Sequence, residues 1–288
     1  SGSEEAEERH RQALDIRREI EDFQGVAASL HNLGNVADNR GQSDEAMRLW
    51  EESLEIERDK GSPVGEAKSL YTIGREMDQK DPDKAEEFYN ESLKIFRSIG
   101  NRRGVARCLH GLSRISSKRS NVKETERLTR GSLAICKEIG DRSGMSTAYG
   151  TLGKIAFDRD DHEEAERSFK QVLEIDRETG NRRGESWALN RLGSIAKELG
   201  NLEEAERRHR QALEVDRDIG NRKGESQELE LLGIIAMQRE NLEEAEILFR
   251  DSGRILKEIE EPLGEWFVDN GYTDPEAEWD FPPTPEDE

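Results

Sequence analysis

Hydrophobic side chains recur at helical spacing through most of the chain, and the segment from Asn181 to Gly200 shows the pattern well. Leu189, Leu192 and Ile195 fall on one face of a helix, while polar residues fill the opposite face. Asn181 has the side chain of a helix N-cap, and Gly200 is suited to the left-handed conformation that often ends a helix. The pattern therefore predicts a helix of about four to five turns.

A second helix is predicted directly after the first. Asn201 is followed three residues later by Glu204, which is the capping-box pattern of a helix start, and the helix ends near Gly220. The same start recurs elsewhere, at Asn121 with Glu124, Asp161 with Glu164, and Asn241 with Glu244. Since almost no residues remain for a connection, we expect antiparallel pairs of helices, each roughly 16 to 18 residues long.

The pair repeats along the chain. Glycine occurs at positions 25, 65, 104, 144, 184, 224 and 264, in steps of 40 residues with one step of 39. A period of this length is typical of solenoid proteins, in which stacked helix pairs share one thin, continuous core. Because hydrophobic residues make up only 32% of the chain, such a core is easier to fill than one large globular core.

A leucine-glycine pair and a later alanine recur in register with this period. The pairs, with isoleucine or serine substituting once each, are Leu33-Gly34, Ile73-Gly74, Leu112-Ser113, Leu152-Gly153, Leu192-Gly193 and Leu232-Gly233. The small residues that follow are Ala46, Ala85, Thr125, Ala165, Ala205 and Ala245. From Gly25 to Gly264 the chain thus resembles the tetratricopeptide repeat (TPR) family. It departs from the common form because leucine or tyrosine stands where tryptophan is usual, and no proline ends the second helix.

The resemblance implies an all-α solenoid, a right-handed superhelix of antiparallel helix pairs that binds proteins. The period of 40 residues, with its Asn-Arg-Arg-Gly links, is most similar to the Pins/LGN scaffold subfamily and to the C-terminal TPR arrays of signalling NTPases. We expect residues 1–24 to form the second helix of a truncated repeat, which would make the chain a fragment of a longer protein. Six helix pairs should follow at 25–61, 65–100, 104–140, 144–180, 184–220 and 224–260, then a cap at 264–273 and an acidic extended tail at 274–288.

The net charge of the chain limits the classes of function that it can have. The formal net charge is -21, so general binding of nucleic acid is disfavoured, and a salt-loving host would account for so acidic a surface. No long apolar run or signal peptide is visible, which favours a cytoplasmic protein without a membrane partner. The two cysteines, Cys108 and Cys136, are expected to be buried thiols rather than a disulfide or a metal pair.

No catalytic pattern is present. The sequence has no glycine-rich phosphate loop, no Cys-x2-Cys pair and no His-x3-His pair. His10 and His209 occupy the same position of their repeats, which indicates packing rather than metal binding. We therefore expect a protein that is not an enzyme and that uses no cofactor and no metal.

The TPR resemblance places a peptide-binding groove on the first helices of the pairs. Carried over by register, its residues are His31, Asn35, Lys68, Tyr71, Arg75, Arg107, His110, Arg114, Lys118, Lys154, Phe157, Trp187, Asn190 and Lys197. Arg75, Arg114 and Lys154 share one position in three successive repeats and form a cationic ladder. Such a ladder could bind the carboxylates of an acidic extended peptide, or it could only neutralise acidic residues of neighbouring helices. A second basic set lies in the links between repeats, and for it pairing with nearby acidic residues is the better interpretation; its members are Arg102, Arg103, Arg142, Arg182, Arg183, Arg222 and Lys223.

The sequence thus predicts a scaffold that binds an acidic protein or peptide segment. A second possibility is the sensor arm of a larger signalling NTPase or transcription regulator whose other domains precede residue 1, and a third is assembly through uncapped ends. The tail is itself a candidate ligand, in its own molecule or in a neighbouring one; the alternative is a disordered tail that only adds solubility. Within one chain it should reach Lys154, Trp187, Asn190 and Lys197, whereas Arg75 and Arg114 would need a tail from another molecule.

Overall fold

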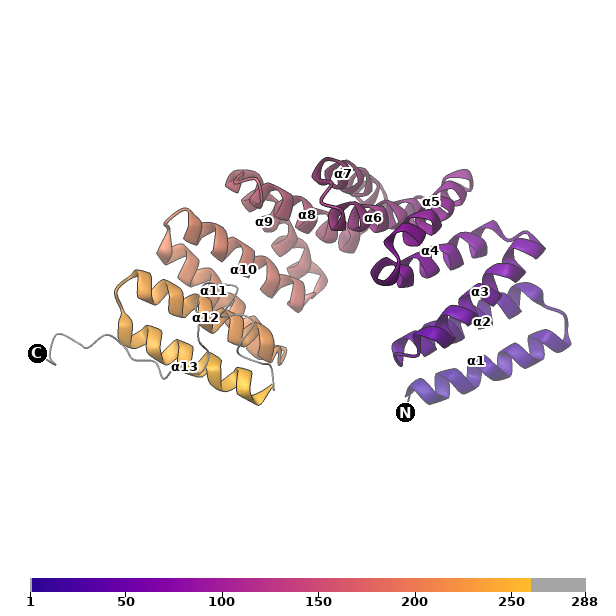
Figure 1. The fold of residues 1–288 in the computed structure, drawn as a ribbon, viewed down its shortest axis with the longest axis horizontal. Coiled ribbons are helices and arrows are strands. Elements are labelled where there is room, and N and C mark those ends of the chain that lie inside the picture. The colour runs from indigo at the N-terminus through magenta and orange to yellow at the C-terminus, as the bar shows by residue number, and fades with distance from the viewer. Residues whose placement is uncertain (1, 260–288) are drawn as a thin grey trace, which may run out of the picture. The chain divides into compact units, whose positions relative to one another are not determined.

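A computed structural model describes residues 2–259, except for the side chains of residues 2–7 and 10. The predicted cap at 264–273 and the predicted tail at 274–288 lie outside the described residues. Within them, thirteen α-helices of 16 to 18 residues follow one another and no strand occurs. Their bounds are α1 Gly2–Glu19, α2 Phe23–Asn39, α3 Ser43–Lys60, α4 Pro63–Lys80, α5 Pro82–Ser98, α6 Arg102–Lys118, α7 Val122–Ile139, α8 Arg142–Phe157, α9 His162–Thr179, α10 Arg182–Glu198, α11 Leu202–Asp218, α12 Arg222–Gln238 and α13 Leu242–Glu258 (Figure 1).

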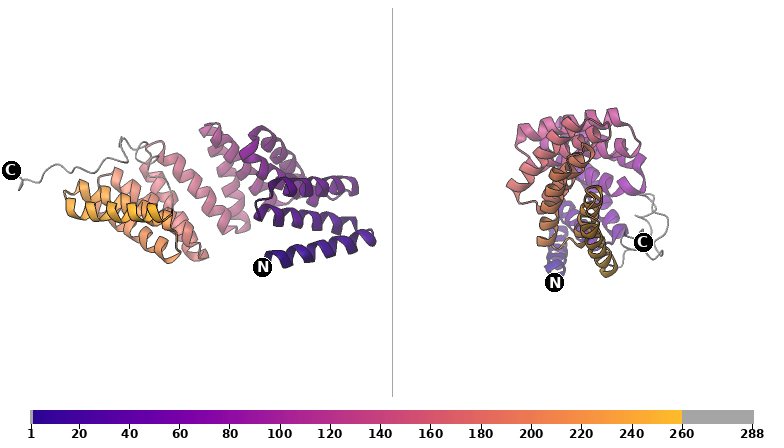
Figure 2. Two further views of the ribbon diagram at one scale, coloured as in Figure 1. Left: turned by 60° about the horizontal axis from the view of Figure 1, so that its bottom comes forward. Right: turned by 90° about the vertical axis from the view of Figure 1, so that its left-hand side faces the viewer.

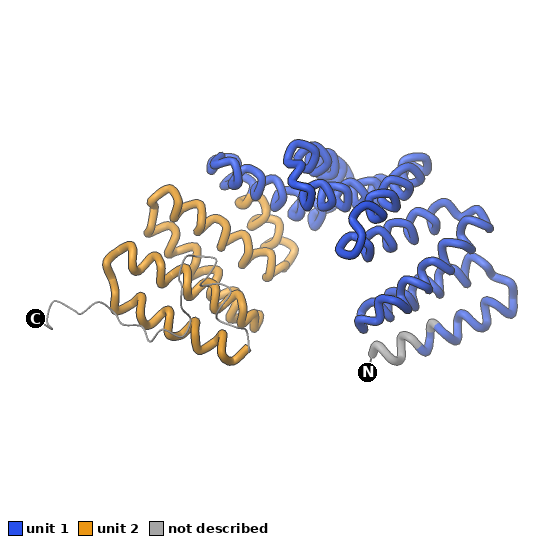
Figure 3. The backbone as a smooth tube through the Cα atoms, in the orientation of Figure 1, with its two compact units in different colours: residues 1–168 blue, residues 169–288 orange. Residues whose placement is uncertain are grey.

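The chain divides into two compact units, residues 1–168 and residues 169–288, with the boundary inside α9 (Figure 3). In each unit the helices form antiparallel pairs, and each pair packs against the next along the chain, as further views show (Figure 2). This is the all-α solenoid that the sequence predicts.

Local sequence explains where the helices begin and end. Asn181 and Asn201 each accept a hydrogen bond from the backbone N–H three residues on, at 3.2 Å, so both act as the predicted N-caps. Gly200 lies in the left-handed region at φ 76°, where a residue with a Cβ would be strained. The turn between α10 and α11 is therefore as short as the sequence indicates.

Two kinds of close approach explain the recurring glycines. A Cβ on Gly104 would lie 2.4 Å from the ring of Phe96, the residue eight positions earlier, so α6 can pack on the end of α5 only with glycine there. The glycine of the leucine-glycine pair lies against a ring of the second helix instead. A Cβ on Gly193 would lie 2.6 Å from the imidazole of the fully buried His209. Equivalent ring contacts join Gly34 with Trp50, Gly74 with Tyr89, and Gly233 with Phe249.

In the first unit, the first helices of successive pairs contact one another. Helix α2 contacts α4, α4 contacts α6, and α6 contacts α8, in addition to the contacts between consecutive helices. Contacts as extensive do not occur among α3, α5 and α7. Because a stack bends toward the side on which its members are closest, α2, α4, α6 and α8 form the inner layer of this unit.

Candidate functional site

The predicted groove residues fall into two groups that belong to different units. Three lie on α10 in the second unit: Trp187, Asn190 and Lys197. The other eleven lie on the inner layer of the first unit: His31 and Asn35 on α2, Lys68, Tyr71 and Arg75 on α4, Arg107, His110, Arg114 and Lys118 on α6, and Lys154 and Phe157 on α8. The two groups are therefore described as separate sites.

Two members of the cationic ladder are paired with aspartates of the preceding repeat. Arg75 donates to the carboxylate of Asp38 on α2 at 2.9 Å. Arg114 forms an ion pair with Asp78 on α4, and the carboxylate of Asp78 is fully buried. Lys118 donates to the same carboxylate at 2.9 Å and to the backbone carbonyl of Asp78 at 2.6 Å. Asp38 and Asp78 thus offset part of the positive charge of the inner layer.

The third member of the ladder differs. Lys154 is exposed and forms no ion pair within residues 2–259. The preceding repeat explains this difference. Asp38 and Asp78 each stand four residues after the glycine of their leucine-glycine pair, and the equivalent position before Lys154 is occupied by Ser117, which has no charge. The neutralising interpretation therefore accounts for Arg75 and Arg114 but not for Lys154.

Two further cations of the inner layer also lack a carboxylate. Lys68 on α4 and Arg107 on α6 are exposed, and in the described part of the chain neither pairs with an acidic residue. Most arginines of the same unit are paired, for example Arg58 with Glu66 and Glu91. Lys68, Arg107 and Lys154, hereafter the unpaired cations, therefore differ from the paired members of the inner layer; Arg103, in the first turn of α6, is likewise exposed and without an acidic partner in the described residues.

Ring side chains lie in the same layer. His31, Tyr71 and His110 occupy one position in three successive repeats and are half-buried. Burial lowers the pKa of His31, and the charges of Lys68 and Arg75 lower it further. Burial, and after it Arg114, likewise lowers the pKa of His110, while Asp78 opposes this shift. Burial raises the pKa of Tyr71. At neutral pH these rings are uncharged, so the lysines and arginines carry the positive charge.

The second basic set, in the links between repeats, is neutralised in part: three of its arginines are paired, whereas Arg103 and Arg183 form no ion pair in the described residues. Arg102 donates to Glu138 at 3.1 Å, Arg182 pairs with Asp218 at 2.9 Å, and Arg222 pairs with Glu225 at 2.6 Å. Pairing is thus the correct interpretation for these three arginines.

In the second unit, Trp187 is the single aromatic residue of α10 and is 37% exposed. The ring of Phe169 packs against it edge to face with 5.4 Å between centroids, and the guanidinium of Arg191 lies 5.8 Å from its centroid. Asn190 donates from Nδ2 to Glu228 at 2.7 Å, and Glu228 also lies 2.7 Å from Nδ1 of the buried His209. Arg191 is not among the residues predicted from the sequence, although it stands one helical turn after Trp187.

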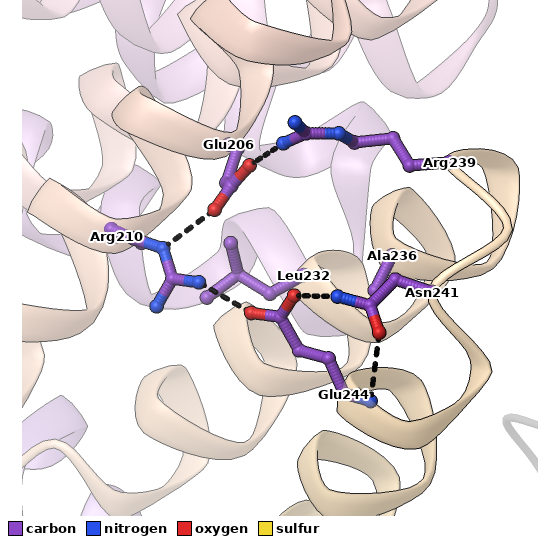
Figure 4. Close-up of a pocket in the computed structure, with 7 residues that line it drawn as sticks. All are labelled: Glu206, Arg210, Leu232, Ala236, Arg239, Asn241 and Glu244. Carbon is purple, nitrogen blue, oxygen red and sulfur yellow. Dashed lines mark hydrogen bonds and ion pairs between the residues drawn. The ribbon is translucent and has the colours of Figure 1, made fainter.

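A crevice of about 390 Å³ lies between α11, α12 and α13, but its charges satisfy one another (Figure 4). Arg210 donates to Glu206 at 2.9 Å and to Glu244 at 2.6 Å; Glu206 also pairs with Arg239. The same four-residue arrangement recurs in the first unit at Glu126, Arg130, Arg159 and Glu164, around a much smaller crevice of about 30 Å³. Because it recurs with its charges paired, we interpret this feature as a clamp between repeats rather than as a ligand site.

Two other kinds of site are absent from the described residues. No cluster of three or more histidine, cysteine or acidic side chains with the arrangement of a metal site occurs there. No helix in that part of the chain has the length and apolar character needed to cross a membrane. Cys108 and Cys136 are both free and buried, as predicted.

The repeated helix pairs and the layer of first helices place the protein in the class of α-helical repeat proteins. Tetratricopeptide repeat models match residues 26–58, and residues 144–218 and 184–258 in overlapping matches, which together span just over half of the chain. The chain belongs to the tetratricopeptide repeat family. No curated protein matches it.

Solved structures with similar folds come from several kinds of protein. A signal transduction ATPase with numerous domains (STAND) that carries a tetratricopeptide repeat sensor, from Pyrococcus horikoshii, has a TM-score of 0.74 at 17% identity over 88% of this chain and 38% of its own. BtubC from P. vanneervenii has a TM-score of 0.65 at 18% identity over 76% of this chain and 93% of its own. A Rap protein complexed with Competence and Sporulation Factor has a TM-score of 0.61 at 14% identity over 90% of this chain and 78% of its own. At these identities the likeness concerns the fold alone.

Proposed function

We propose that this protein is a non-enzymatic, cytoplasmic scaffold that binds an acidic extended segment of another protein along the inner layer of its first unit. One observation carries the proposal. In a chain with a net charge of -21, three exposed cations on successive helices of the inner layer pair with no carboxylate among the described residues: Lys68 on α4, Arg107 on α6 and Lys154 on α8.

The inner layer supplies more than charge. Tyr71 on α4 and Phe157 on α8 lie on the same layer as the cations and offer ring surface to apolar side chains of a ligand. Arg75 and Arg114 are held by aspartates and are therefore pre-positioned rather than mobile, which lowers the entropy cost of binding. An extended segment can present alternate side chains to such a surface. A segment with repeated acidic residues matches it best.

A hexaglutamate peptide tests this proposal. Contacts of a charged group to a carboxylate contribute about 1.5 to 3 kcal/mol when partly buried and less at an exposed site. The triple change Lys68→Glu, Arg107→Glu and Lys154→Glu should therefore weaken binding at least about tenfold, or 1.4 kcal/mol. The matched control reverses three exposed cations on second helices, Arg48→Glu, Lys94→Glu and Lys123→Glu, at equal change in net charge.

Circular dichroism should show equal helical content for both triple variants. Equal loss of affinity in the two would mean that net charge alone attracts the peptide, and the inner layer would then not be the site.

A second candidate function is the sensor arm of a signalling NTPase or transcription regulator. It is favoured by the likeness to the tetratricopeptide repeat sensor of the STAND protein over 88% of this chain. The period of 40 residues keeps the Pins/LGN scaffolds as the alternative within the family. The gene sequence upstream of residue 1 distinguishes the candidates. A phosphate loop there would favour the NTPase arm, a helix-turn-helix the regulator, and more repeats the scaffold.

A further inference from the structure

Helix α10 carries a basic stripe with an aromatic residue, in which Arg183, Trp187 and Arg191 are exposed and Lys197 is partly buried. Arg183, Trp187, Arg191 and Lys197 are spaced so that, at 100° per residue, they fall within about 120° of the helix circumference. We call these four residues the α10 stripe. Trp187 is fixed in place by the ring of Phe169, and Arg191 covers it on one side. The stripe thus combines a rigid aromatic surface with positive charge.

The cations of the stripe are unusual because they have no carboxylate partner. The other arginines of this unit are held by acidic residues, for example Arg177 by Glu185 at 2.8 Å and Arg217 by Glu225 at 2.9 Å. Arg183, Arg191 and Lys197 form no ion pair with any residue in the described part of the unit. Among the described arginines of this unit, those without an acidic partner therefore both lie on α10, where Lys197 adds a third unpaired cation; Lys257 on α13 is the other described lysine in the same condition.

The chain contains a segment of complementary chemistry. Residues 274–288 hold seven acidic residues and no lysine or arginine, and Trp279 and Phe281 flank Asp280. Aromatic rings of the segment can pack against Trp187, while its carboxylates can pair with the cations on either side. We infer that the α10 stripe binds residues 274–288 of this same chain. The inference rests on the proposed function only in that both assign ligand binding to the first helices.

Chain length permits the contact within one molecule. The described helices end at α13, and α10 is three packed helices away along the stack, roughly 30 Å at 8 to 10 Å per helix. Trp279 lies 20 residues after residue 259, and an extended chain of that length spans up to about 70 Å. The same segment of a second copy could bind in the same way, and its binding would then depend on protein concentration.

The test uses the full-length chain. Trp279→Ala with Phe281→Ala should free the stripe without altering any described helix. A labelled synthetic peptide of residues 274–288 should then bind this double variant at least about tenfold more tightly than the unchanged chain, whose own segment competes. Adding Arg183→Glu, Arg191→Glu and Lys197→Glu to the double variant should abolish that binding. The triple change at Arg48, Lys94 and Lys123 again serves as the charge-matched control.

Hydrogen exchange provides a second readout that needs no added peptide. Amides of residues 187–198 should exchange more slowly in the unchanged chain than in the double variant, and the difference should vanish in the charge-reversed stripe. Protection that rises with protein concentration would assign the segment to a second copy.

Three results separate this inference from the proposed function. Failure of the peptide to bind the double variant at millimolar concentration would overturn the inference about the α10 stripe. Equal affinity of the peptide for the double variant with and without the charge-reversed stripe would also overturn it. Reversing Lys68, Arg107 and Lys154 in the first unit should leave the peptide's affinity unchanged. Loss of hexaglutamate binding with retained binding of the 274–288 peptide would therefore leave this inference standing by itself.

Discussion

Lys118 on α6 donates from Nζ to both the carboxylate and the backbone carbonyl of Asp78 on α4, at 2.9 and 2.6 Å. The same fully buried carboxylate pairs with Arg114. One aspartate therefore joins two successive repeats and fixes two cations of the inner layer. Its removal should affect folding and binding in opposite directions.

Replacing Asp78 with asparagine should destabilise the first unit by about 1 to 3 kcal/mol, because a buried partner of two charged groups is lost. At the same time, the released Arg114 and Lys118 should raise the affinity for hexaglutamate a few-fold, or roughly 1 kcal/mol. Asp38→Asn is the control, since Asp38 is partly exposed and holds only Arg75. Thermal melting and peptide titration measure the two effects; lower affinity in the Asp78 variant would mean that its orienting role outweighs its charge.

Binding of hexaglutamate should strengthen as the pH falls below 6.5. Burial and nearby cations lower the pKa values of His31 and His110, so in the unbound protein both rings are neutral at pH 7 and take up protons only below their ordinary pKa. An acidic ligand favours the protonated rings and therefore binds together with protons. A charge pair at 4 Å in water contributes about 1 kcal/mol, or roughly fivefold per histidine.

The surroundings of the two histidines define the control for this pH effect. Lys68 and Arg75 face His31 from α4, while Arg114 and Asp78 lie near His110. The double variant His31→Gln and His110→Gln should lose most of the pH dependence between pH 7 and 5.5. An undiminished pH dependence would assign the proton uptake to other groups.

Two glycines of helices should respond in opposite ways to the same substitution. Alanine at Gly193 would place a Cβ 2.6 Å from the buried His209 ring and should cost about 1 to 3 kcal/mol. Alanine at Gly253 meets no atom within 4 Å and should stabilise α13 by up to about 1 kcal/mol through helix propensity. Thermal melting of both variants checks the signs. A neutral Gly193→Ala would show that the second unit can relax around the ring.

Glu230→Gln should stabilise the second unit at neutral pH. Burial raises the pKa of Glu230, while a hydrogen bond from Ser252 at 3.2 Å opposes the shift. A carboxyl whose pKa is higher in the folded state binds its proton more tightly there, so stability falls as pH rises from the unfolded pKa through the folded one. Glutamine removes this penalty. The gain in melting temperature should be larger at pH 7 than at pH 4, and an equal gain at both would contradict the charge argument.

The sequence by itself determined the helix pairs and their register. Helix periodicity, N-caps and terminal glycines depend on residues a few positions apart, so the helix predicted from Asn181 to Gly200 is observed as Arg182–Glu198. The repeat also placed Lys154 and Trp187 on first helices, because register carries over from one repeat to the next.

Only the tertiary structure decided which charges are paired. Arg75 pairs with Asp38 and Arg114 with Asp78 across 36 or 37 residues of sequence, whereas Lys154 and Arg191 pair with no carboxylate in residues 2–259. Ion pairing depends on the distance between side chains of different repeats, and that distance follows from how closely the helices pack. The pattern of one helix contains no such information, so the cations available to a ligand could be recognised only in the folded stack.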